Sequence, residues 1–372
     1  MEKPAIIIDQ AFNMRSGFSG EEEPRSVLTC LVGRPKMTWG CGMECLDYFI
    51  GSEAEEKSGI LIIKSPLTDD GHIDDFDDIE KIWETIYSKE LTINPEDHSV
   101  LIAVPGDTKE IDREKIACIM MESFNIPNLY IANKHELIMV KEAKSDGIIF
   151  DSGEKVTSIV PIKEWKEIKG QGEVSKFGGR NVNEYLIKLL NHVNVCLTTR
   201  EEKKIAEVIK KQMCYVALDY EAEINKKQDN EYVLPNGDKI KLKNTIYKTG
   251  EILFNPSLIG KEEEGFAKKC FDVIQKFDSI EDKKKLYSNI VLSGGNTLLK
   301  GFDKRFEKEI KGLVPAEMKE NVNVIAKENR ENSAWIGGSI YSSLPLMKDL
   351  WLTKDEYMEY GSEYANTKYQ KK

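Results

Sequence analysis

A short stretch of this chain, residues 148–157, combines residue types that can handle a phosphate and a metal ion. An apolar, β-favouring run ends at Asp151 and turns through Ser152 and Gly153. A buried strand that stops at an aspartate and turns at a glycine presents a carboxylate and backbone N–H groups at one edge of a sheet. Both groups suit a phosphate–metal complex. One such turn alone is weak support, since most are ordinary turns.

The beginning of the chain repeats this arrangement. Residues 6–8 are three isoleucines that run into Asp9, and Arg15, Ser16 and Gly17 follow. A carboxylate at a strand end, with a glycine turn close by, again suits a phosphate and its metal. The repeat indicates a duplicated architecture with a cleft between two halves.

A third segment, residues 290–301, reads as a buried strand that runs through Ser293, Gly294 and Gly295 into a helix. Paired glycines let a flat ring or a phosphate approach the backbone, and a helix N-terminus favours anions. The same residues also suit a tight strand–helix turn without a ligand. From the segment alone, both interpretations stay open.

Alternating strands and helices must position these segments. We expect strands at residues 59–64, 100–104, 129–132 and around 148–162, helices at 77–91, 111–124, 135–143, 181–195, 200–223 and 262–277, and a hairpin turn at 235–238. Residues 36–50 have no clear period and read as an exposed loop with large apolar side chains. No low-complexity linker separates the halves, so the fold itself must join them.

Length, amino-acid composition and net charge limit the classes of protein to which this chain can belong. A chain of 372 residues with 40% hydrophobic residues favours two lobes, each with its own core. The net charge of −11 argues against general nucleic-acid binding, which needs a basic surface. Seven cysteines without a Cys-x-x-Cys pair indicate free thiols in a reducing compartment. No apolar run reaches about 18 residues and no signal peptide is evident, so we expect a cytoplasmic protein without membrane insertion.

Eight ordered stretches along nearly the whole chain resemble the actin family. They lie at residues 32–35, 77–83 (DDIEKIW), 125–130, 148–157, 214–219 (CYVALD), 291–295 (VLSGG), 333–340 (SAWIGGSI) and 351–357. The resemblance implies an α/β, two-lobed fold of the actin/Hsp70/hexokinase ATPase type, with duplicated mixed sheets flanked by helices and four subdomains around a cleft. The first lobe would comprise residues 1–141 plus 333–372, with an outer subdomain at about 30–66. The second would comprise residues 142–332, with an outer subdomain at about 178–261.

The resemblance also implies which residues would hold ATP or ADP and its Mg²⁺ or Ca²⁺. Those for the nucleotide are Asp9, Arg15, Asp151, Ser152, Gly153, Gly179, Lys210, Gly294 and Gly295, and those for the metal are Asp9 and Asp151. Arg15 stands where actins have a phosphate-binding lysine, so a cation is retained. The resemblance supports the metal-binding role of Asp9 and Asp151 less strongly, because the positive charge of Lys134 could take the place of the metal ion.

Much of this site departs from the actin pattern. The phosphate-wrapping loop after Asp9, which contains glycine and serine in actins, is residues 10–13 (QAFN) here and is one residue shorter. Without glycines, backbone N–H groups cannot approach phosphate so closely. Glu154-Lys155 replaces the Asp-Gly of the second loop. Around the nucleoside, Lys211 replaces a glutamate, Leu299 a tyrosine and Glu331 a lysine.

The glutamine and histidine that position the attacking water in actins are replaced by Lys134 and Ser158. Hydrolysis gains most from positioning and electrostatics, so this double loss should remove most of the rate enhancement. We therefore expect no catalytic residues and no efficient ATPase. We hypothesise that the Lys134 ammonium projects toward Asp9 and Asp151 and partly replaces the charge of the metal. The alternative is that it points into solvent.

Of the regions that actins use for contacts with other proteins, some keep the apolar character of actins and others do not. Residues 258–265 would form the plug between actin strands, but three consecutive glutamates there would be costly to bury. The tail, residues 366–372, is polar and basic where that of actin is apolar, so conventional filaments are disfavoured. The groove that receives actin-binding proteins keeps an apolar set that either packs as core or docks other actin-like subunits or an amphipathic helix: Val140, Tyr341, Leu344, Leu346 and Leu350.

These features predict a divergent actin-like cytoskeletal protein that acts as a structural or interaction subunit, with a degenerate nucleotide cleft and little or no ATP hydrolysis. The first alternative is an ATP-binding, polymerising ATPase of the actin type. A weaker alternative is an actin-related subunit of a nuclear chromatin complex, which keeps a nuclear location open. Many such proteins carry insertions, whereas this chain is close to actin in length.

Overall fold

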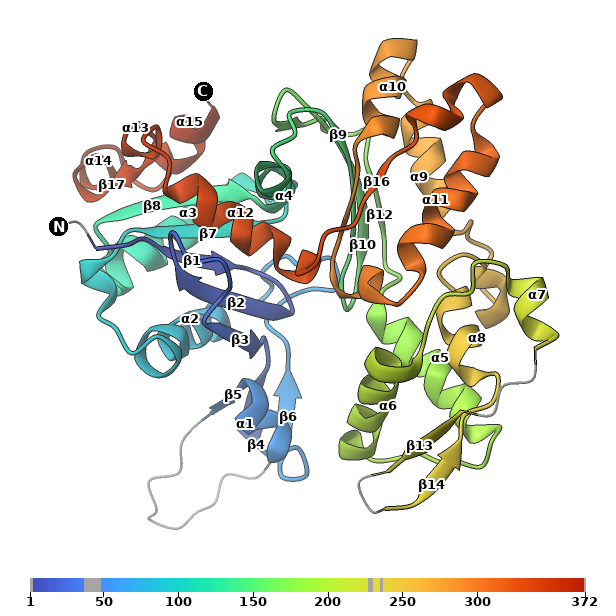
Figure 1. The fold of residues 1–372 in the computed structure, drawn as a ribbon. Coiled ribbons are helices and arrows are strands. Elements are labelled where there is room, and N and C mark those ends of the chain that lie inside the picture. Colours follow the sequence, from blue (N-terminus) through green and yellow to red (C-terminus); the bar gives the residue numbers. More distant parts are fainter. Residues whose placement is uncertain (1–2, 37–47, 227–229, 235–236, 371–372) are drawn as a thin grey trace. The chain divides into compact units, whose positions relative to one another are not determined.

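The computed structural model describes residues 3–36, 48–226, 230–234 and 237–370 (Figure 1). By its internal contacts the chain divides into two compact units, unit 1 with residues 1–143 and 332–372 and unit 2 with residues 144–331. Most of the loop expected at 36–50 and the first half of the turn expected at 235–238 lie outside the described residues.

Unit 1 is built on a six-stranded mixed sheet. Its centre is the parallel trio β1 (Ile6–Asp9), β7 (Val100–Val104) and β8 (Asn128–Asn133), which are rich in isoleucine, valine and leucine and are mostly buried. With β2 (Asn13–Phe18), β3 (Ser26–Thr29) and β17 (Leu352–Thr353), the strand order is β17-β8-β7-β1-β2-β3. Because the trio is parallel, its carboxyl ends lie at one edge of the sheet. Asp9 and Lys134 therefore come from the same edge.

Alternate residues of β1 serve the two faces of this sheet. Ile6 and Ile8 belong to a core that also takes side chains from α2 (Phe76–Thr85) and α3 (Glu110–Cys118). Ile7 belongs to a second core with Leu137 of α4 (Lys134–Glu142) and Trp335 of α12 (Ser333–Ser342). The Trp335 indole Nε1 donates a hydrogen bond to the Ile7 carbonyl over 3.2 Å. Figure 1 shows α12, from the end of the chain, lying across β1 and β2, from its beginning.

The other elements of unit 1 are a small sheet of order β5-β4-β6 and short helices. They are β4 (Val32–Pro35), β5 (Phe49–Ile50), α1 (Gly51–Glu56), β6 (Leu61–Lys64), a π-helical turn (Ile86–Glu90) after α2, a 3-10 turn (Pro95–Asp97), a second π-helical turn (Ile119–Ser123) after α3, α13 (Met347–Leu350), α14 (Lys354–Tyr360) and α15 (Tyr364–Gln370).

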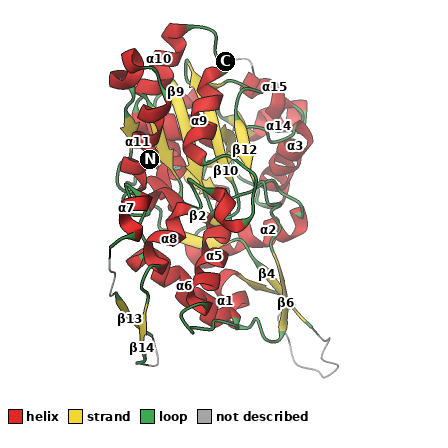
Figure 2. Ribbon diagram, turned by 90° about the vertical axis from the view of Figure 1, so that its right-hand side faces the viewer, coloured by secondary structure: helices red, strands yellow, loops and turns green. Residues whose placement is uncertain are grey.

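Unit 2 contains a second mixed sheet. Its order is β11 (Lys166–Glu167), β10 (Thr157–Lys163), β9 (Gly147–Ser152), β15 (Ile290–Ser293) and β16 (Val324–Ile325), and β12 (Glu173–Ser175) also pairs with β10. Figure 2 shows α9 (Phe266–Gln275) in front of β9, β10 and β12. The centroid of the Phe150 ring, on β9, is 5.4 Å from the centroid of the Phe266 ring and 4.9 Å from that of the Phe306 ring, on α11 (Phe302–Leu313). Aromatic packing therefore joins α9 and α11 to the sheet.

The remaining elements of unit 2 are mostly helices around this core. They are α5 (Gly179–Asn191), α6 (Arg200–Met213), α7 (Tyr220–Ile224), the hairpin β13 (Glu231–Val233) and β14 (Lys239–Lys241), α8 (Thr245–Glu251), α10 (Ile280–Ser288) and the 3-10 turns Pro256–Ile259, Gly295–Leu298 and Ala316–Asn321; a last 3-10 turn, Arg330–Asn332, crosses the boundary of the units.

Two sequence predictions were wrong in part. The helix expected at 200–223 is interrupted between α6 and α7, because Tyr215 and Val216 are extended: their N–H groups donate to the carbonyls of Ile246 and Lys300 over 3.0 and 2.9 Å. Asp219 then caps α7 by accepting from the Ala222 N–H. After Gly294 the chain makes only a short 3-10 turn, and α11 begins at Phe302. The strand therefore does not run directly into a helix at this point.

Two further features concern the cysteines and the helices. Among the described residues, Cys118, Cys196, Cys214 and Cys270 are free thiols. None of the helices formed by the described residues has the length and apolar character that a membrane crossing requires.

Candidate functional site

On unit 1, Arg15 lies against Asp9 rather than pointing outward. The two residues face each other across the β1–β2 ladder, and the Arg15 Nη1 is 3.8 Å from the Asp9 Oδ2. Their side chains are only 13% and 6% exposed. Arg15 also donates from Nε to the Asn332 Oδ1 over 2.6 Å and from Nη1 to the Asn13 carbonyl over 2.9 Å. The arginine that was expected to bind phosphate is thus held by unit 1 itself.

Lys134 is the first residue of α4 and follows directly on β8. Asn133 caps the helix, since its Oδ1 accepts the His135 N–H over 2.9 Å. A lysine at this end of a helix meets the positive pole of the helix dipole, which disfavours a cation. Glu136 lies in the same turn, and Asp9 ends a strand at the same edge of the sheet, so acidic residues are present on this side of unit 1.

On unit 2, strand alternation separates Asp151 from Ser152. Ser152 follows Phe150 into the buried side of β9, whereas Asp151 faces the opposite side. In the ladder Asp151 has Ser158 of β10 as one neighbour and Ser293 of β15 as the other. Neighbours of this kind have Cβ atoms about 5 Å apart. The carboxylate is therefore flanked by two serines, and Ser158 is only 5% exposed.

The Ser152 hydroxyl is fully committed to a chain of hydrogen bonds inside unit 2. Thr157 Oγ1 donates to the Phe177 carbonyl over 2.7 Å and lies 2.7 Å from Ser152 Oγ. Because a hydroxyl has one proton, Ser152 must be the donor to Thr157. Ser152 Oγ in turn accepts from Asn296 Nδ2 over 3.0 Å, and the same amide reaches the Gly153 carbonyl over 2.8 Å. Ser152 thus has no proton left for a phosphate oxygen.

Two of the candidate glycines are explained by contacts within the chain. Gly294 has φ +82°, and a Cβ there would lie 2.2 Å from the Ser152 carbonyl oxygen. A Cβ on Gly179 would lie 2.8 Å from Glu154 Oε2 and 2.9 Å from Asn296 Oδ1. Both glycines are therefore needed for the close approach of the 152–154 turn. Gly295 differs, because a Cβ there would meet nothing within 4 Å.

The first turn of α5 is also occupied from within. The Gly179 N–H donates to the Gly153 carbonyl over 2.9 Å, and the Arg180 N–H donates to the Glu154 carbonyl over 2.8 Å. The Asn181 side chain closes the turn by accepting the Gly178 N–H over 3.0 Å. N–H groups at a helix start are a common phosphate-binding device, and two of these already have backbone acceptors.

The half-buried Glu154 and the buried Lys210 act on each other as opposite charges. Burial raises the pKa of Glu154, and the positive charge of Lys210 is the largest influence that opposes this rise. Burial likewise lowers the pKa of Lys210, against the negative charges of Glu154 and then Glu207. Each group is thus the largest single source of opposite charge for the other.

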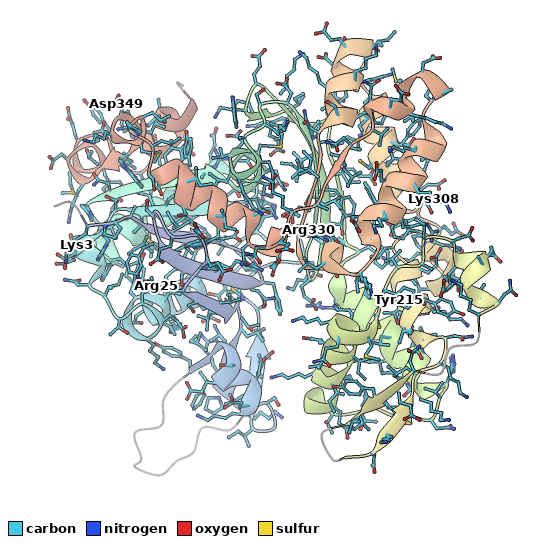
Figure 3. All side chains as sticks on the ribbon, in the orientation of Figure 1. Lys3, Arg25, Tyr215, Lys308, Arg330 and Asp349 are labelled. Atoms are coloured by element: carbon cyan, nitrogen blue, oxygen red, sulfur yellow. The ribbon has the colours of Figure 1, made fainter. Side chains whose placement is uncertain are left out.

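Sequence reasoning missed Asn296 and Arg330. Asn296 joins the two loops of unit 2 through the bonds described above. Arg330, labelled in Figure 3, donates from Nε to the Thr297 Oγ1 over 2.9 Å and from Nη2 to the Thr297 carbonyl over 2.6 Å. An asparagine directly after paired glycines was the one available signal, since this residue often bonds to nearby backbone in turns.

Comparison with known protein families decides the relationship. The family model described as Actin matches residues 1–370. The chain belongs to the actin family. Its α/β fold, with mixed sheets flanked by helices, is accordingly that of the actin-type ATPases. Proteins of the actin family generally bind ATP or ADP with a divalent cation, interact with actin-like or actin-binding proteins and are typically cytoskeletal.

The described residues fit a nucleotide of this kind poorly. The Ser152 hydroxyl, the first N–H groups of α5 and the surfaces of Gly179 and Gly294 are all used within unit 2. Arg15 is held by Asn13 and Asn332 within unit 1. No three His, Cys, Asp or Glu side chains of the described residues gather as a metal-binding group. The nucleotide and metal roles of the candidate residues stay predictions.

The contact regions differ in exposure. Of the five apolar residues expected in the partner groove, Leu344 and Leu346 are 37% and 46% exposed, while Tyr341 packs on Tyr130 with ring centroids 5.8 Å apart. In the acidic loop, Glu263 Oε2 accepts from Lys269 Nζ over 2.9 Å and from Ser175 Oγ over 3.0 Å. These bonds fasten the loop to α9 and β12.

Proposed function

We propose that this protein is a structural or interaction subunit of the actin type, with a degenerate nucleotide site and little or no ATP hydrolysis. The observation that carries the proposal is the pair Lys134 and Ser158, which occupy the positions of the two water-positioning residues of actins. A serine hydroxyl does not titrate near neutral pH, so Ser158 cannot take over the part of a histidine. An ammonium has donors only, so Lys134 cannot accept a proton from water while charged.

Hydrogen bonding around the candidate residues supports the same conclusion. Transition-state stabilisation in phosphoryl transfer requires N–H groups, cations and a metal aimed at the γ-phosphate. In this chain Arg15 is directed onto Asp9, Asn13 and Asn332, and the Ser152 proton is directed onto Thr157. Groups that are already satisfied within the fold must lose those bonds before they can serve a ligand.

The interaction half of the proposal rests on unit 1. Leu344 and Leu346 are exposed apolar residues between α12 and α13, on the surface where an amphipathic partner helix is expected to dock. Tyr341 and the half-buried Val140 and Leu350 would form the floor of this surface.

The test is the nucleotide content and turnover of the freshly purified full chain. The protein is heat-denatured, the released nucleotide is separated by chromatography, and phosphate release from Mg·ATP is followed on an undenatured sample. We expect no sustained phosphate release, with either no nucleotide or uncleaved ATP in the extract. Mostly ADP, together with continuing phosphate release, would overturn the proposal in favour of an active ATPase.

A further inference from the structure

The Glu154 carboxylate lies over the start of helix α5, at the place where an anion is best accommodated. Its Oε2 is 2.8 Å from the point that a Cβ of Gly179 would occupy, so it covers the open side of this glycine. α5 has 13 residues, and its first N–H groups bond to the carbonyls of Gly153 and Glu154. A carboxylate there meets the positive end of the helix dipole.

The positive charges near Glu154 favour its ionised form. Lys210, on the last turn of α6, is buried, and it is the charge that most favours ionised Glu154; Arg180 and Lys211 act in the same direction more weakly. A buried lysine needs a negative partner to stay charged. Within unit 2 the charge that acts most strongly on it is Glu154, with the exposed Glu207 second.

We propose that Glu154 is a built-in anionic ligand, which occupies the Gly179–Lys210 part of the candidate nucleotide site and thereby excludes adenine nucleotides. The inference rests on the proposed function, because it explains why the site is degenerate, and it adds the residue that keeps the site closed. Neutralising this carboxylate should leave Lys210 in need of an anion, and drawing it back should uncover Gly179. A nucleotide phosphate supplies that anion.

The test compares the affinity of the full-length wild type, Glu154→Gln and Glu207→Gln for Mg·ATP by calorimetric titration. Glu207 is the matched control, since it is an exposed carboxylate that also acts on Lys210 but does not cover Gly179. We expect the Kd of Glu154→Gln to fall at least about tenfold, the size of one charge-assisted contact, and that of Glu207→Gln to stay within about twofold of the wild type.

Glu154→Gln leaves a buried lysine without its partner, so a second variant protects the test against misfolding. Glu154→Asp keeps the charge but draws the carboxylate back by one methylene, and we expect its Kd for Mg·ATP to lie between those of the wild type and Glu154→Gln. An unchanged Kd in the folded variants would overturn the inference, as would tight binding by the wild type that weakens on either substitution. Phosphate release by the wild type would contradict the proposed function but not the inference about Glu154. The inference is tested only by the Kd values of the variants for Mg·ATP.

Discussion

Two electrostatic effects of opposite sign act on Lys134. As the first residue of α4 it opposes the helix dipole, which costs about 0.3–1 kcal/mol. A hydrogen-bonded partner such as the Asp9 carboxylate, at the same sheet edge, would contribute about 1.5–3 kcal/mol. With such a partner, the favourable effect is the larger one.

We therefore expect Lys134→Gln to lower the free energy of unfolding by about 1 kcal/mol or more, measured by urea denaturation at pH 7. The dipole effect alone predicts the opposite sign. A variant that is a few tenths of a kcal/mol more stable than the wild type would show that no carboxylate holds the ammonium, and the charge-replacement hypothesis would be abandoned.

The adjacent glycines 294 and 295 allow a matched comparison. Gly294→Ala puts a side chain into a φ of +82° and against the Ser152 carbonyl, so we expect a loss of about 3 kcal/mol or more in unfolding free energy. Gly295→Ala meets open space, and its effect should stay within about 0.5 kcal/mol. Urea denaturation of both variants decides the matter. Equal losses would mean that the turn tolerates or rejects both side chains for a reason other than this contact.

For single residues, the sequence predicts where a glycine is needed but not which atoms approach it. Gly294 and Gly179 were predicted as places of close approach to a nucleotide, and each also lies against atoms of its own chain. A ligand and a folded-back turn place the same demand on backbone conformation, so residue type alone cannot distinguish them.

Among the elements, the acidic loop before α9 has the clearest dependence on pH. The Lys269 ammonium is the main cause that lowers the pKa of Glu263 to about 2, with Ser175 and Lys261 contributing. Because the folded pKa lies below the unfolded value, ionised Glu263 stabilises the fold above about pH 4.5. This stabilisation is lost as the pH falls toward about 2.

We expect Glu263→Gln to reduce the free energy of unfolding by about 1 kcal/mol at pH 7, a modest figure because the carboxylate is partly exposed and screened. Near pH 2.5 most of the difference between variant and wild type should disappear. The exposed neighbour Glu264, changed to Gln, serves as the control. A difference that persists unchanged into acid would rule out the ion pair as its source.

The sequence predicted whether a segment is a helix or a strand better than it predicted where a helix is interrupted. The apolar strands at 100–104 and 129–132 agree with β7 and β8 because their patterns are strong over the whole element. The single helix expected at 200–223 was wrong because Tyr215 and Val216 pair with residues far along the chain. Such long-range pairing overrides local helix periodicity and leaves no trace in it.

At the scale of the whole molecule, charge opposes self-assembly. The chain carries a net charge of −11, and Glu262 and Glu264 remain exposed on the acidic loop. Like charges repel when copies approach, and acids are costly to bury in a contact. We expect the protein to stay in the supernatant when it is centrifuged at high speed in KCl and MgCl₂ with ATP. Recovery in the pellet, with filaments visible by electron microscopy, would contradict this expectation.

The order of synthesis has a consequence for unit 1, whose chain is interrupted by the whole of unit 2. Ile7, Leu101, Ala103, Ala132 and Leu137 leave the ribosome early, but Trp335, which packs with them, leaves late. At ribosomal speed the delay is on the order of ten seconds or more. During this interval the apolar face and the edge of β8, which later pairs with β17, await their partners. Nascent chains of this protein should therefore be most prone to aggregate before release, and most dependent on chaperones at that stage.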